Sequence, residues 1–187
     1  MSRVIHVFRT PDRFVAGTVG EPGDRTFYLQ AVDEAKVVSV QLEKEQVAVL
    51  AERLSALLDE VVRRLGDATV EPGEAAVDTE PLSTPVEQEF RVGTMGLGWD
   101  IESRAIVVEL LAVSEQEVDE SMVLDDTEDG PDAVRVFLSL MQARAFATRA
   151  ERVLSAGRRP CPLCKEPLGP QGHICPRQNG YRRQAEA

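Results

Sequence analysis

Residues Thr26 to Leu42 read TFYLQAVDEAKVVSVQL, and this stretch decides the class of the fold. Two runs rich in β-branched and aromatic side chains, residues 26–32 and 37–42, flank the polar connection Asp33–Lys36. So short a connection joins neighbouring antiparallel strands. The stretch therefore predicts a β-hairpin within an antiparallel or mixed sheet.

Two further strands are predicted before this hairpin, at residues 4–8 and 14–19, separated by a break at Pro11 and Asp12. The second of them reaches the hairpin through residues 20–24, which contain two glycines and a proline. We therefore expect it to pair antiparallel with the run at 26–32.

A long helix follows the hairpin, because the apolar period changes from two to 3.6 residues. Gly66 comes directly after this pattern and is a suitable C-terminal cap. The apolar positions at helical spacing are Val47, Leu50, Ala51, Leu54, Leu57, Leu58, Val61 and Leu65.

The second half of the domain begins after a linker at residues 67–87, which is acidic and rich in proline. A strand is predicted at 89–99, a turn at 100–103, and a partner strand at 105–113. The partner strand shows little alternation, which favours burial on both of its faces.

An acidic loop at about 115–130 and a second helix complete this half. Nine carboxylates and no basic residue lie between Glu115 and Asp132, which favours an exposed loop. The helix is expected to begin near Pro131, where the first helical position tolerates proline, and to end before Gly157. Its expected apolar stripe consists of Val134, Phe137, Leu138, Met141 and Ala145.

The fold class is therefore α+β, with a sheet of about five to six strands and two main helices in residues 1–156. The pattern Phe-x-x-Gly-Thr-x-Gly occurs at Phe14 and again at Phe90, each time before further strands and a helix. An internal ββα duplication would account for this repetition, and chance similarity over seven positions is the competing possibility.

The C-terminal residues 157–187 are predicted to form a zinc knuckle. Every cysteine of the chain and one of its two histidines lie there, at Cys161, Cys164, His173 and Cys175. Thiolate and imidazole groups are the ligands that zinc prefers, and a Cys-x2-Cys loop brings two thiolates to one metal. Such a four-ligand site is normally closed, so the expected cofactor is a structural Zn²⁺ ion.

A disulfide framework and a deaminase site fit these cysteines less well. A disulfide framework normally uses an even number of cysteines, and here there are three. The Pro-Cys-x-x-Cys order at residues 160–164 also occurs in zinc deaminases, which additionally need a His-x-Glu pair. The remaining histidine, His6, is followed by Val7 and Phe8 and does not supply that pair.

Charge and hydropathy limit the possible partners and locations. The net charge is −11, yet residues 157–187 contain six basic and two acidic residues, so the body is strongly acidic. An acidic body repels phosphate backbones, which makes nucleic-acid binding unlikely outside the basic tail. No segment has the roughly 18 uncharged apolar residues of a membrane span, and we expect a cytoplasmic location.

Candidate ligand-binding residues lie in the glycine-rich strand at 89–99. Glycines in a strand permit a bulge or the close approach of a ligand, and they also simply relieve crowding. If a groove exists there, Thr94, Trp99 and Asp100 are the side chains expected to line it. No catalytic residue is predicted: His6, with its apolar strand neighbours, is more typical of a structural or surface histidine.

Three segments together resemble an actinobacterial family that carries a domain-of-unknown-function label. They are SRVIHVF at residues 2–8, FRVGTMGLGWD at 90–100, and the ending from Arg159 to Tyr181 with its Cys/His motif. The resemblance covers essentially the whole chain. It implies a cytoplasmic protein, often encoded beside a histidine-phosphatase-like protein, a kinase-like protein and the ligase of mycothiol synthesis, and it supplies no activity, substrate or catalytic residue.

The leading functional prediction is a zinc-binding, non-catalytic binding or adaptor protein with a protein partner. The alternative is an enzyme, or an accessory subunit of one, that acts on a phosphorylated or thiol metabolite in the groove. A weaker alternative is nucleic-acid contact through the basic tail, against which the scarcity of aromatic residues counts. The sequence leaves the partner and the oligomeric state open.

Overall fold

The computed structural model describes residues 3–66, 77–114, 126, 130–157, 161–166, 168–169, 172–175 and 177. Three predicted features therefore lie partly outside the described residues. They are the first part of the linker (67–76), most of the acidic loop (115–125 and 127–129), and parts of the C-terminal segment, including 158–160 and 178–187.

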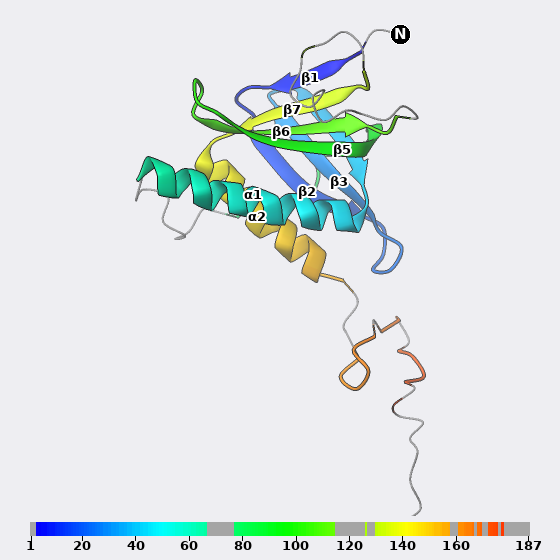
Figure 1. Ribbon diagram of the computed structural model, residues 1–187. Coiled ribbons are helices and arrows are strands. Elements are labelled where there is room, and N and C mark those ends of the chain that lie inside the picture. The colour runs from blue at the N-terminus through cyan, green and yellow to red at the C-terminus, as the bar shows by residue number, and fades with distance from the viewer. Residues whose placement is uncertain are drawn as a thin grey trace, which may run out of the picture.

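Seven strands form one mixed sheet in the order β1-β7-β6-β5-β4-β3-β2, and two helices pack together on one of its faces (Figure 1). The predicted α+β class with a mixed sheet and two helices is confirmed. The strands are β1 (Ile5–Phe8), β2 (Arg13–Val19), β3 (Thr26–Asp33), β4 (Lys36–Leu42), β5 (Gln88–Asp100), β6 (Ala105–Ala112) and β7 (Ala133–Leu138), and the helices are α1 (Lys44–Leu65) and α2 (Leu140–Ser155).

The predicted hairpins are present. β3 pairs antiparallel with both β2 and β4, and β5 pairs antiparallel with β6. β4 and β5 pair in parallel, because α1 connects them as a crossover. β6 is buried from Ala105 to Leu111, as the lack of alternation in its sequence predicted, and the buried residues include Glu109.

The start of the predicted second helix is wrong: its first turns are a strand. Residues 133–138 form β7, and α2 begins only at Leu140, after the N-cap Ser139, whose hydroxyl accepts a hydrogen bond from the backbone N–H of Gln142. β7 lies between β1 and β6, and all six of its residues are buried, so its sequence shows little alternation. Val134, Phe137 and Leu138 therefore belong to the sheet.

The helices and the sheet face that they cover form the main core together. Six of the eight predicted stripe positions of α1 are buried, whereas Leu57 is half-buried and Leu65 is exposed. Gly66 ends the helix with a φ of 60°, in the left-handed region that glycine favours. In α2 the buried stripe is formed by Ala143, Phe146, Ala147 and Ala150 instead of Met141 and Ala145. The ring of Phe146 stacks on that of Phe14 in β2, with 4.7 Å between centroids.

The second part of the linker, residues 77–87, packs on the edge strand β2. The Asp78 carboxylate accepts hydrogen bonds from Arg13 of β2 and Arg149 of α2, and Leu82 is buried. The sequence shows few apolar side chains that would hold this linker. Its second part is also held by the buried side chain of Gln30, which donates to the carbonyl of Ser83 and accepts from the N–H of the same serine.

The contact between Leu82 and β2 requires a glycine at position 17. A Cβ built on Gly17 would lie 2.6–2.9 Å from three carbons of the Leu82 side chain. We expect Gly17→Ala to lower the free energy of unfolding by about 1–3 kcal/mol, because the leucine must move. Urea unfolding measures this change.

The double variant Gly17→Ala/Leu82→Ala separates this clash from other effects. It is expected to lose less stability than the sum of the two single variants, because the alanine at 82 leaves room for the new methyl group. Gly157→Ala is a control, since a Cβ there approaches no atom closer than 3.4 Å. Additive losses in the double variant would contradict the proposed clash.

After β1, the order of three strands followed by one helix occurs twice. The two Phe-x-x-Gly-Thr-x-Gly patterns begin in β2 and β5, the first strand of each set. The predicted ββα duplication stays a prediction, and in the observed order three strands, not two, precede each helix. Among the described residues, neither helix has the length and apolar character needed to cross a membrane.

Candidate functional sites

The four predicted metal ligands lie together in the C-terminal segment. The ligand atoms of Cys161, Cys164, His173 and Cys175 all lie within 4.8 Å of one another. The Sγ of Cys164 is 3.4 Å from Nε2 of His173. Cys161 and Cys175 are buried, and the other two side chains are half-buried.

Backbone hydrogen bonds shape the two turns that carry these ligands. In the first turn, the N–H of Lys165 donates to the carbonyl of Cys161, and the N–H of Cys161 donates to the carbonyl of Glu166, at 2.9 and 2.7 Å. In the second, the N–H of Gly172 donates to Gly169, with a φ of 79° at Gly172 that favours glycine. Each turn therefore directs a pair of ligands toward the same point.

The thiols at this site have opposite pKa shifts. Hydrogen bonds donated by the backbone N–H groups of Cys164 and Leu163 lower the pKa of Cys161 to about 6, which favours its thiolate form. Burial and the neighbouring Cys161 raise the pKa of Cys164. A bound cation would favour the thiolate form of every cysteine, since metal ligands must be deprotonated.

The arrangement fits a tetrahedral metal ion. With Zn–S bonds of about 2.3 Å and Zn–N bonds of about 2.0–2.1 Å, a sulfur and a nitrogen in a tetrahedral site stand about 3.6 Å apart. The Cys164–His173 separation of 3.4 Å is close to that value. These four residues could therefore hold a metal ion.

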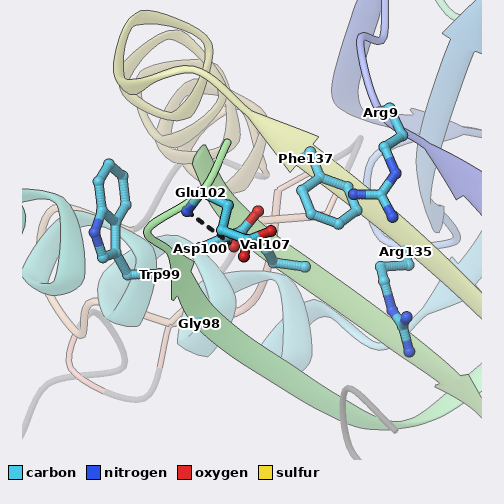
Figure 2. A pocket seen from close by; sticks show the side chains of 8 residues that line it. All are labelled: Arg9, Gly98, Trp99, Asp100, Glu102, Val107, Arg135 and Phe137. Atoms are coloured by element: carbon cyan, nitrogen blue, oxygen red, sulfur yellow. Dashed lines mark hydrogen bonds between the residues drawn. The ribbon is translucent and has the colours of Figure 1, made fainter. Parts of the chain in front are cut away.

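Two of the three predicted groove residues line a pocket. Trp99 and Asp100 border a cavity of about 320 Å³, together with Arg9, Arg135 and Phe137 among others (Figure 2). Thr94 does not line it; it lies further along β5, next to an irregularity in the pairing with β6. The sequence pattern did not reveal the two arginines and the phenylalanine, because they come from β7 and from the end of β1.

His6 is paired with a carboxylate. Its Nε2 lies 3.0 Å from Oε1 of Glu89, in a contact between partly exposed side chains. Within the described part of the chain, this is the one hydrogen bond made by the imidazole ring of His6. No hydroxyl or thiol group is bonded to the ring there. The histidine thus holds β1 to the start of β5.

Comparison with known proteins gives one match. A family model described as "Protein of unknown function (DUF3090)" matches residues 6–175, which include the sheet except for Ile5, both helices and the four Cys/His residues. No curated protein and no solved structure matches the chain.

Proposed function

The chain belongs to this family of unknown function, and we propose that it is a zinc-binding protein that acts by docking to a partner protein rather than by catalysis. In this proposal one Zn²⁺ ion is held by Cys161, Cys164, His173 and Cys175. The metal stabilises the C-terminal segment, and the segment presents a docking surface. The docking role rests on one observation: Ile174, between the ligands His173 and Cys175, is exposed.

The ligand set supports a structural ion. Three thiolates and one imidazole fill a tetrahedral site and leave no position for water or substrate, unlike catalytic zinc sites, which keep one position open. The three cysteines are free thiols, which suits a reducing compartment such as the cytoplasm.

The docking surface consists of Ile174 and Leu163, next to the ligands. Ile174 is 83% exposed and Leu163 is 47% exposed, in a segment with few apolar side chains to bury. Binding a partner would remove this apolar area from water. Lys165 and Arg177 lie nearby in the sequence, so an apolar depression with an acidic rim is the partner surface that fits.

Affinity purification from the source organism tests the docking role. We expect Ile174→Asp to lose the proteins that wild type enriches, because the substitution places a charge in an apolar contact. Ile101→Asp is the matched control, since Ile101 is 79% exposed at the turn between β5 and β6. Quantitative mass spectrometry compares the three samples.

Metal content must be measured in the same samples, so that loss of the ion is not mistaken for loss of docking. Equal recovery of the same proteins with wild type and Ile174→Asp would overturn the docking surface. If wild type instead recovers nucleic acid in place of proteins, and the amount recovered falls steeply as the salt concentration rises, the weaker nucleic-acid alternative is the correct one.

A second candidate role is that of an enzyme, or an accessory subunit of one, acting on a phosphorylated or thiol metabolite. The position of Trp99 and Asp100 at a pocket favours a ligand-binding role of this general kind. The chemistry of that pocket narrows the class of ligand.

A further inference from the structure

The pocket beside β5 lies on the face of the sheet opposite to the helices. Gly98 of β5 pairs with Val107 of β6, and Val107 pairs with Phe137 of β7, so all three occupy the same face. Their neighbours Leu97, Val108 and Val136 belong to the core that the helices cover. The pocket therefore has an apolar floor, formed by Val107 and Phe137.

The floor is open because position 98 has no side chain. A side chain there would stand on the same face as Val107, which also lines the cavity. Gly98 lies within a paired strand and is not among the glycines with a positive φ. The backbone conformation at position 98 would therefore accept other residues. What this glycine does in the structure is leave the floor of the pocket open.

Charged groups of opposite sign face each other across this floor. Arg9 and Arg135 stand on one side, and Asp100 and Glu102 on the other (Figure 2). Ser103 donates a hydrogen bond from its hydroxyl that lowers the pKa of Asp100, and the charge of Arg9 lowers it further. Asp100 is therefore a carboxylate at neutral pH.

The two arginines differ in what they bind. Arg135 donates to Glu109 from two nitrogens and to Asp126 from a third. Arg9 instead lies over the pocket floor, with its guanidinium carbon 4.5 Å from the centroid of the Phe137 ring. Within the described part of the chain, no hydrogen bond uses the N–H groups of Arg9, which are free to bind a ligand.

Arg9 and Asp100 are near enough to influence each other, yet they form no ion pair within 4.0 Å. The space between them is the cavity. A ligand that carries one negative and one positive group could bind both sides at once. A purely anionic ligand would be repelled by Asp100 and Glu102, and a purely cationic ligand would be repelled by the two arginines.

We propose that this pocket binds a small zwitterionic ligand of the amino acid or dipeptide class, with its carboxylate on Arg9 and its ammonium group on Asp100 and Glu102. The side chain of the ligand then lies on Val107 and Phe137. The volume of about 320 Å³ is at the lower end of the roughly 300–1,000 Å³ of ligand pockets, which suits a molecule of this size.

The test measures binding by isothermal titration calorimetry and not by tryptophan fluorescence, because the side chain of Trp99 packs against the core on the helix side of the sheet. The protein is titrated with three probes: glycyl-leucine, N-acetyl-glycyl-leucine and glycyl-leucinamide. We expect a saturable heat change with glycyl-leucine. We expect dissociation constants about tenfold or more higher for the other two probes, because each lacks one charged group.

Substitutions assign each end of the ligand. Arg9→Gln is expected to weaken glycyl-leucine about tenfold and to leave the amide unchanged, whereas Glu102→Gln should weaken both probes that carry an ammonium group. Gly98→Val should abolish binding by filling the floor, with an unchanged melting temperature, since valine suits a strand. Arg152→Gln and Glu151→Gln on the exposed surface of α2 are matched controls.

Three results would overturn the proposal. The first is no saturable change with glycyl-leucine up to about 10 mM, a concentration well above ordinary metabolite affinities. The second is equal affinity for the three probes. The third is unchanged binding by a folded Gly98→Val variant, which would place the ligand elsewhere.

Discussion

Protein purified without added metal is expected to contain one zinc ion per chain, and the Cys164→Ser variant to contain none. The variant removes a thiolate from a site whose four ligand atoms lie within 4.8 Å of one another. Structural sites in small peptides bind zinc with a free energy of about 10–16 kcal/mol, and much of this binding free energy depends on the complete set of ligands. Elemental analysis by mass spectrometry identifies and counts the metal.

Leu163→Ser is the control for this measurement, because Leu163 lies between two ligands but offers none. It should keep the ion. The main unfolding transition of Cys164→Ser should resemble that of wild type, since among the described residues no hydrogen bond or ion pair joins residues 161–177 to the sheet or helices. No metal in freshly reduced wild type would overturn the zinc site.

The second large effect is expected from Arg135→Met, which should lower the free energy of unfolding by about 3–5 kcal/mol. Glu109 has no exposed surface, and Arg135 donates two hydrogen bonds to one of its carboxylate oxygens, at 2.9 and 2.7 Å. Without the guanidinium, a buried carboxylate loses its ion pair within the sheet. Denaturant unfolding at neutral pH measures the loss.

Two comparisons make this result specific. Arg91→Met removes a salt bridge to Glu43 in which both side chains are more than half exposed, and it should cost less than about 1 kcal/mol. The double variant Glu109→Leu/Arg135→Met should recover much of the lost stability, because it removes the buried charge along with its partner. Equal losses for Arg135→Met and Arg91→Met would contradict the role of the buried pair.

Local patterns were sufficient where structure depends on neighbours in the sequence. The hairpin at residues 26–42 follows from alternation and a short turn, and α1 follows from its apolar stripe and Gly66. The four metal ligands were also predictable, because two short turns hold them and both turns lie within fifteen residues. In each case the spacing along the chain fixes the spacing in space.

Long-range pairing accounts for what the sequence did not reveal. β7 was assigned to a helix because a strand buried on both faces shows no alternation, and only Ser139 separates it from α2. For a similar reason, only some of the residues that line the pocket were predicted from the sequence. Trp99 and Asp100 are marked by the glycines beside them, whereas Arg9 reaches the site only through the pairing of β1 with β7.

The parallel pairing of β1 with β7 also bears on how the chain folds during synthesis. Ile5 pairs with Ala133, so the strand of this sheet that is synthesised first pairs with the one that is synthesised last. The nascent chain keeps β1 unpaired while the hairpins and α1 form, and closing so long a loop is slow. β1 is therefore expected to dock late, and an exposed β7 edge before that moment is the point at which the nascent protein is open to aggregation.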